Sequence, residues 1–181
     1  RLLMNRLLTI VLAGAILLAG CAAPGTQGGA EVRQLSATPI YVTGGDQPEG
    51  SAAVYDALSG FGVELLRQVR TQEGKQVLIS PLSAALALSM SANGARGDTL
   101  KQFEVLFGGD LEAINAACAQ LMQEYQTLGG STQCHIANSV WADPEGQIKD
   151  EFVGKCQGIF DAQVFQADLS DKGIVKVVNG W

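Results

Sequence analysis

The clearest helical pattern lies in the stretch that follows residue 50. Apolar side chains recur there at steps of three and four, at Val54, Leu58, Phe61, Leu65 and Val69. Because an α-helix turns once in about 3.6 residues, this spacing gathers the apolar side chains on one face. It predicts an amphipathic helix that begins near Ser51 and ends at Glu73–Gly74.

An uncharged stretch follows, since no charged residue stands between Lys75 and Arg96. Its first apolar residues, 77–79, predict a short buried strand. Ser80 and Pro81 favour a helix start. A serine side chain at the cap accepts a hydrogen bond from a free backbone amide of the first turn. Proline at the first helical position sacrifices no hydrogen bond, because the amide there has no partner within the helix. A helix with no charge on any side is predicted to lie in the middle of a domain.

The rest of the chain alternates between helical and strand patterns. Helices are predicted after a cap at Asp98, from about Asp110 to 128 and around 152–159, and strands at 131–142 and 162–165. Asp168 opens a last predicted helix that runs to Trp181. The predicted strands are few, short and far apart, so we expect them hardly to make a sheet. The pattern is typical of a helix-rich α+β domain.

The first 20 residues have the pattern of an export signal. Arg1 and Arg6 precede an apolar run over 7–18, which is shorter than the roughly 20 residues a membrane span needs. The run ends in LAGC at 18–21, which resembles a bacterial lipobox, so Cys21 is predicted to receive a diacylglyceryl group. The alternatives are an ordinary export signal with a chance cysteine, and a plain transmembrane anchor.

These features divide the chain into three parts. We predict a lipoprotein signal peptide over 1–20, a lipidated Cys21 with a flexible tether over 21–50, and a folded part over 51–181. The tether is rich in Gly, Pro, Thr, Ser and Gln and has few apolar groups to bury. Its apolar cluster at 39–42 could dock, although no sequence feature indicates where. The protein is then predicted to be exported and lipid-anchored at the cell envelope, facing the periplasm or the extracellular space.

Charge and composition exclude several function classes. The 181 residues include 12 basic and 18 acidic side chains, a net charge of −6, which argues against nucleic acid as a partner. His135 is the single histidine, so a histidine metal centre or general base is not expected. No G-x-S-x-G elbow, P-loop or dinucleotide motif occurs, and the serine at 80 has no lysine three residues on. We expect neither an enzyme nor a cofactor.

Three cysteines remain after Cys21, namely Cys118, Cys134 and Cys156. Export would permit one disulfide, from Cys134 to either of the other two. The alternative is that they act as small buried hydrophobes, since two of them fall on apolar helix faces.

Several blocks of the chain resemble the serpin family. QVLISPLSAALALSMSANGARGDTLKQFEVLF, from Gln76, resembles the family's strand, Ser-Pro-x-Ser helix start, central helix and Gly-Ala-(Arg/Lys)-Gly-x-Thr turn. Residues 136–141 resemble its second strand of sheet A. Residues 152–168 resemble the following helix and first strand of that sheet, and 178–181 resemble the Ile-Asn-x-Trp of the next helix. The blocks cover 51–181, about the first third of a serpin domain.

The resemblance implies a fold of three β-sheets surrounded by helices, of which only the helix-rich N-terminal portion is present. It implies a serine-type, or cysteine-type, endopeptidase inhibitor. A protease attacks an exposed reactive loop, and the cleaved loop inserts into sheet A as a new strand. That loop is expected beyond Trp181, so this stretch alone is not expected to inhibit.

The resemblance also implies roles for individual residues. Ser80, Pro81, Ser83 and Asn179 match the shutter, where sheet A parts to admit the loop. From the residues alone, helix capping by Ser80 and ordinary packing by Ser83 are the simpler interpretation. Gln76 departs from the family's usual asparagine, which puts a bond from that position in doubt.

Three hypotheses for the whole protein follow. The first is a surface-tethered protease inhibitor whose partners are a target protease and, through Cys21, a lipid membrane. The second is a non-inhibitory binding or structural lipoprotein with a serpin fold. The third is an inactive, truncated gene product.

Overall fold

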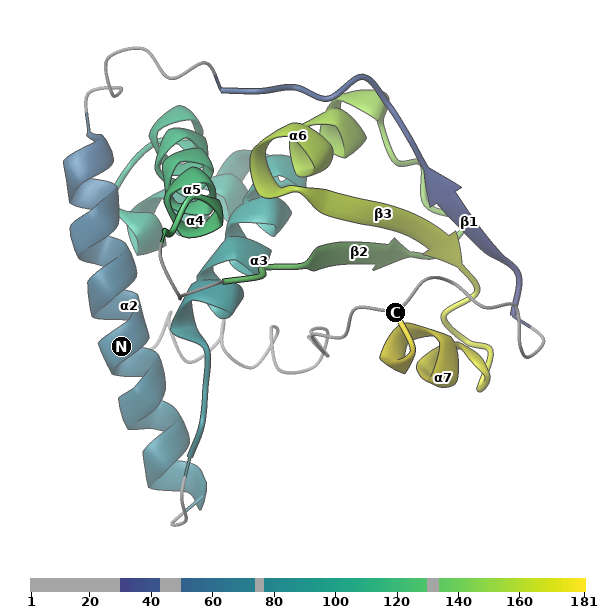
Figure 1. Cartoon of the computed structure of the whole chain (residues 1–181), viewed down its shortest axis with the longest axis horizontal. Helices are drawn as coiled ribbons and strands as arrows, with labels where there is room; N and C mark the ends of the chain where they lie inside the picture. The colour runs from purple at the N-terminus through teal and green to yellow at the C-terminus, as the bar shows by residue number, and fades with distance from the viewer. Residues whose placement is uncertain (1–29, 43–49, 74–76, 130–133) are drawn as a thin grey trace.

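The structure is a computed structural model that describes residues 30–42, 50–73, 77–129 and 134–181. A group of helices lies beside a small sheet (Figure 1). In chain order the elements are β1 (Val32–Leu35), α2 (Ser51–Glu73), α3 (Pro81–Gly94), α4 (Gly97–Phe107), α5 (Leu111–Gln126), β2 (Asn138–Ala142), α6 (Asp150–Phe160), β3 (Ala162–Ala167) and α7 (Ile174–Asn179). The predicted lipobox and Cys21 lie outside the described residues.

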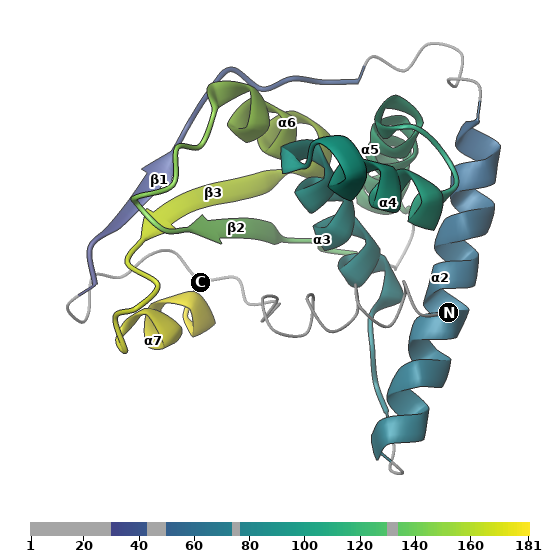
Figure 2. The same ribbon diagram turned by 180° about the vertical axis from the view of Figure 1, so that it is seen from behind.

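The helix α3 occupies the centre of the helical group, as its lack of charge predicted. It contacts α2, α4, α5 and α6, and Leu86 in its middle is 1% exposed. The view from behind shows the same arrangement, with α2 on the outer side (Figure 2). The helix start at Ser80–Pro81 and the extent of α2 are confirmed. The helix predicted from about Asp110 is α5, and the structure shows that Asp110 caps it, since its Oδ1 accepts a bond from the Ala113 amide at 2.8 Å.

The sheet is the first point at which the prediction is wrong. It has three strands in the order β1-β3-β2, although isolated short strands were not expected to pair. Strands β2 and β3 run parallel, which is possible because α6 carries the chain back between them. Trp141 pairs with Phe165 across these strands, and their rings stack at 4.4 Å.

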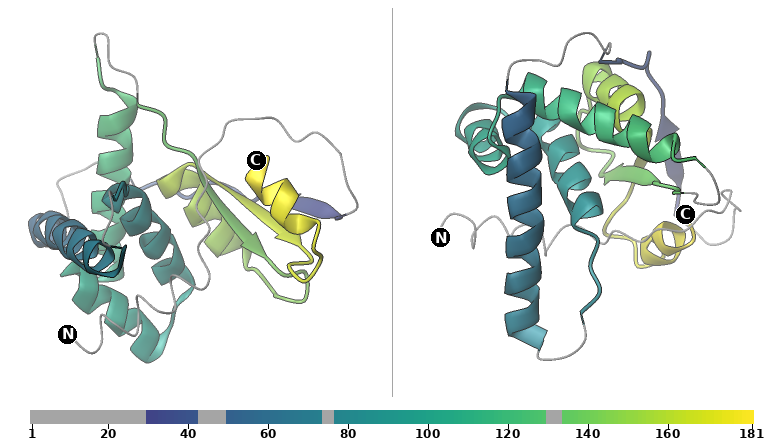
Figure 3. Two further views of the ribbon diagram at one scale, coloured as in Figure 1. Left: turned by 90° about the horizontal axis from the view of Figure 1, so that it is seen from below. Right: turned by 60° about the vertical axis from the view of Figure 1, so that its left-hand side comes forward.

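The third strand comes from the predicted flexible tether, which is a second correction. Within the N-terminal strap, as we name residues 32–42, β1 pairs antiparallel with β3 from Val32 opposite Ala167 to Leu35 opposite Val164. The pairing satisfies backbone groups at the edge of β3 that would otherwise lack partners. The strap then crosses α6 (Figure 3). Low apolar content therefore did not prevent order, because main-chain hydrogen bonds hold the segment.

The strap fits closely on α6 because two positions on that helix lack a side chain. The Ile40 amide donates to the Gly154 carbonyl at 2.9 Å, and the Ala37 amide donates to Gln157 Oε1 at 3.2 Å. A Cβ on Gly154 would lie 2.5 Å from the Thr38 carbonyl oxygen, and one on Gly158 would lie 2.7 Å from the Ile40 nitrogen. The apolar cluster at 39–42 thus docks on a groove made by glycines.

Three smaller predictions also need correction. Residues 77–79 form no strand, and Leu78 is 98% exposed, since no strand among the described residues lies beside it to pair with. Asp98 is not a cap, because α4 begins one residue earlier at Gly97, whose φ of 55° turns the chain into the helix. The last helix begins at Ile174 rather than Asp168, because Asp168 Oδ1 holds a local turn by accepting from the Ser170 amide at 2.8 Å.

Within the described part of the chain, no helix combines the length and apolar character needed to cross a membrane.

Candidate functional site

Ser80, Pro81 and Ser83 form one local unit at the start of α3. The Ser80 and Ser83 hydroxyls share a hydrogen bond of 2.8 Å, and Ser80 Oγ also accepts the Ser83 amide at 3.3 Å. Ser80 therefore caps the helix and contacts the second serine through one oxygen. Either hydroxyl can be the donor, so the bond can be exchanged without moving the backbone.

Pro81 fixes the position of this serine pair against α2. A Cβ on Gly62 of α2 would lie 3.0 Å from the Pro81 Cβ, so the two backbones approach closely only because Gly62 has no side chain. The proline also loses no hydrogen bond at the first helical position. The serine pair thus stands on a rigid junction of two helices.

Asn179 is not joined to the serine pair. It is the last residue of α7 and its side chain is exposed. No hydrogen bond between described residues connects it to Ser80 or Ser83. The C-terminal side of α7 is instead tied to the sheet through Trp181, whose indole nitrogen donates to Gln163 Oε1 at 2.8 Å. The structure therefore brings three of the four predicted shutter residues together and leaves the fourth apart.

A buried amide pair is the polar feature that sequence reasoning missed. Asn93 Nδ2 donates to Asn115 Oδ1 at 2.8 Å, and Asn115 Nδ2 donates back to Asn93 Oδ1 at 2.9 Å. The two side chains are 5% and 6% exposed, and Asn93 also donates to the Ser89 carbonyl at 3.0 Å. The pair fastens the C-terminal end of α3 to α5. Its sequence signal was slight, because Asn93 stands before a glycine and indicates a turn equally well.

The three described cysteines are free thiols, so neither disulfide alternative is formed. Cys118 and Cys156 are buried. Burial raises the pKa of Cys118 to about 11, an effect that an interaction with Ser89 partly opposes. Burial also raises the pKa of Cys156 to about 12. Because the thiolate is the reactive form, both are small buried hydrophobes and not nucleophiles.

His135 has no metal-binding surroundings in the part of the chain that the structure describes. Its side chain is exposed, and the described residues hold no group of three or more potential ligands.

Comparison with known proteins gives consistent results. Residues 56–181 match the family model described as "Serpin (serine protease inhibitor)". Iripin-8 of Ixodes ricinus is 29% identical over 128 residues, which cover 67% of this chain and 32% of the relative. Human neuroserpin is 28% identical over 138 residues, which cover 73% of this chain and 33% of the relative.

A solved structure shows the same fold. The crystal structure of human glycosylated kallistatin superposes with a TM-score of 0.65 at 16% identity, covering 71% of this chain and 36% of that one. The chain spans about a third of the length of the curated relatives named above. The helix-rich group with its small sheet is thus a partial copy of the larger fold, as the resemblance implied.

Proposed function

Because this chain belongs to the serpin family, we propose that the protein that contains it inhibits a serine or cysteine protease. The match over residues 56–181 carries the proposal, and one similar protein is named plasma serine protease inhibitor of Bos taurus. The parallel neighbours β2 and β3 support it as well, since they lie in the order expected for the second and first strands of sheet A. A protease is accordingly the proposed partner, and the protein is not proposed to be an enzyme.

The chemistry proposed is a single turnover that consumes the inhibitor. The protease nucleophile attacks the scissile carbonyl of the reactive loop and forms an acyl-enzyme with the chain before the cut. The peptide C–N bond breaks, and the chain after the cut leaves with a new, protonated amino terminus. The loop then inserts as a strand beside those already present. The helical group described above would serve as the rigid body against which the sheet opens.

A covalent complex is the direct test. The full-length protein is incubated with a panel of serine and cysteine proteases, and SDS-resistant complexes are sought by electrophoresis. Each protease is also added with its nucleophile blocked, and this control must give no complex. If no protease in the panel gives a complex, inhibition is overturned and a non-inhibitory serpin-fold protein is the better description.

We further propose that the serine pair acts in the shutter. The shared 2.8 Å bond between Ser80 and Ser83 supports this, because paired hydroxyls can exchange partners as neighbouring segments slide. Ser83→Ala removes that bond and is expected to speed the loss of inhibitory activity on mild heating. Ser91→Ala is the matched control, since this exposed hydroxyl of the same helix donates to the Ala87 carbonyl within that helix. If the two variants lost inhibitory activity at equal rates, the shutter role would be refuted and the serine pair would only cap the helix.

The lipid anchor at Cys21 is a separate proposal. It rests on the short apolar run and the LAGC pattern at 18–21. We expect the protein to take up labelled fatty acid and to sediment with membranes when produced in bacteria. Cys21→Ser should abolish both. Sedimentation of the serine variant with membranes would favour an uncleaved apolar anchor instead.

A further inference from the structure

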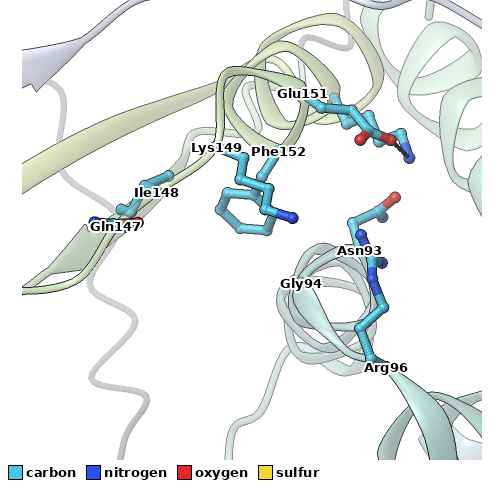
Figure 4. A pocket seen from close by; sticks show the side chains of 9 residues that line it. Asn93, Gly94, Arg96, Gln147, Ile148, Lys149, Glu151 and Phe152 are labelled. Carbon is cyan, nitrogen blue, oxygen red and sulfur yellow. Dashed lines mark ion pairs between the residues drawn. The ribbon is translucent and has the colours of Figure 1, made fainter.

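A pocket of about 290 Å³ opens between the C-terminal end of α3 and the N-terminal end of α6 (Figure 4). We name it the basic pocket. Its lining residues come from α3, the turn before α4, the segment before α6, and α6 itself, and they are Asn93, Gly94, Arg96, Gln147, Ile148, Lys149, Glu151, Phe152 and Lys155. It lies at the opposite end of α3 from Ser80, so it is separate from the site discussed above.

Positive charge exceeds negative charge in the basic pocket. Arg96, Lys149 and Lys155 line it together with one acid, Glu151. That acid forms an ion pair with the 23% exposed Lys155, at 2.8 Å between Nζ and Oε1. The hydrogen bond and charge of Lys155 lower the pKa of Glu151, with smaller contributions from Arg96 and Lys149. Two cations therefore remain without a carboxylate of their own among the described residues.

The two cations point into the same space. In Figure 4 the ammonium of Lys149 and the side chain of Arg96 approach from opposite walls, with Asn93 beside them. The Arg96 guanidinium uses one nitrogen to donate to the Ala95 carbonyl at 3.2 Å, which leaves further N–H groups for a ligand. Glu151 attracts both cations as well as Lys155, but one carboxylate among three cations leaves an excess of positive charge that an anion in the pocket would balance.

Two parts of the wall of the basic pocket, at Asn93 and Phe152, are held in place before any ligand arrives. The buried bonds to Asn115 and to the Ser89 carbonyl fix Asn93. Phe152 packs against α3 at Gly94, where a Cβ would lie 3.5 Å from the ring. Fixed walls reduce the ordering cost of binding. The ring and Ile148 also give the pocket an apolar side, with room for more than a bare ion.

We propose that the basic pocket binds a doubly charged oxyanion, a phosphate or sulfate group, either free or on a small organic molecule. Arg96 would contact the oxygens through its planar N–H groups and Lys149 through its ammonium. Phe152 and Ile148 would contact the organic part when one is present.

Calorimetric titration of the full-length protein tests the proposal. Inorganic phosphate, inorganic sulfate and phenyl phosphate are added separately at low ionic strength, because salt screens exposed charges. We expect a dissociation constant of about 1 mM or tighter for at least one of them. Tighter binding of phenyl phosphate would identify a group on an organic carrier as the ligand, whereas equal binding would identify the free ion.

Variants of the lining residues distinguish binding in the basic pocket from a general attraction of anions to basic side chains. Lys149→Gln and Arg96→Gln should each weaken binding about 5-fold or more, since each removes a charged donor. Glu151→Gln should tighten binding several-fold, because it frees Lys155 for the ligand. Lys172→Gln is the control, as it makes the same charge change at an exposed position outside the pocket lining. No binding up to about 20 mM, or equal weakening by Lys172→Gln, would overturn the proposal.

Discussion

Gly158→Ala should destabilise the protein, although alanine is the better helix former. The added Cβ would overlap the backbone of Ile40, which lies 2.7 Å away at its nitrogen. Neither group is the flexible end of a side chain, so relief requires the strap to leave α6 or the helix to move. The perturbation therefore tests whether the contact between these two segments contributes to stability.

The expected size follows from the contacts that would be lost. Two hydrogen bonds hold the strap on α6, from the Ile40 amide to Gly154 and from the Ala37 amide to Gln157, and each contributes about 1 kcal/mol. Ile40 is 37% exposed in place, so its partial burial adds roughly 1 kcal/mol. The freed segment regains conformational entropy, and alanine in a helix contributes about 0.5–1 kcal/mol in favour of folding. After these two opposing terms are subtracted, we expect Gly158→Ala to lower the free energy of unfolding by about 1–2 kcal/mol.

The measurement compares two glycine variants in denaturant unfolding. Gly60→Ala is the control, because nothing lies within 4 Å of a Cβ at that position of α2, and it should stabilise the protein by about 0.5–1 kcal/mol. Tryptic cleavage after Arg33, an exposed residue of β1, gives a second readout and should be faster only in Gly158→Ala. If Gly158→Ala were as stable in denaturant and as resistant to trypsin as Gly60→Ala, the strap would not contribute to the stability of the fold.

Three further outcomes follow from the buried polar groups and thiols. Asn115→Ala should cost about 1–3 kcal/mol because the buried Asn93 amide loses both of its bonds with Asn115 and keeps only the one to the Ser89 carbonyl; a double variant with Asn93→Ala that costs the sum of the single changes would show that the pair is not coupled. Iodoacetamide at pH 8 should modify Cys134 in the folded protein and reach Cys118 and Cys156 only in denaturant, as counted by mass spectrometry. The raised pKa values of Cys118 and Cys156, about 11 and about 12, mean that the folded state holds these protons more tightly than the unfolded state. Their contribution to the free energy of unfolding is complete below about pH 9 and is lost as the pH rises towards 11–12. The denaturant concentration at the unfolding midpoint should therefore fall over that pH range, and it should fall less when both cysteines are alanine.

Most helices could be predicted because their signals are local, although the starts of α4 and α7 could not. Spacing of apolar residues set the extent of α2, and the serine–proline pair set the start of α3. The strap could not be predicted, because what holds it is a sheet edge and a glycine groove on α6, far away in the sequence. Residues 77–79 show the converse error, since an apolar run is a strand only where another strand lies beside it. At the candidate site, the cap of Ser80 was local and confirmed, whereas the Asn93–Asn115 pair joins residues 22 positions apart.

The docking of the strap shortens the length of chain that would connect an anchored Cys21 to the folded domain. A fully extended chain from Cys21 to the start of α2 would span roughly 100 Å, whereas one from Cys21 to Val32, where β1 joins the sheet, would span at most about 40 Å. If Cys21 carries the proposed anchor, Val32 at the edge of the sheet is then held within about 40 Å of the membrane surface. Release of the strap would more than double the largest distance between the domain and the membrane, without any change in the length of the chain.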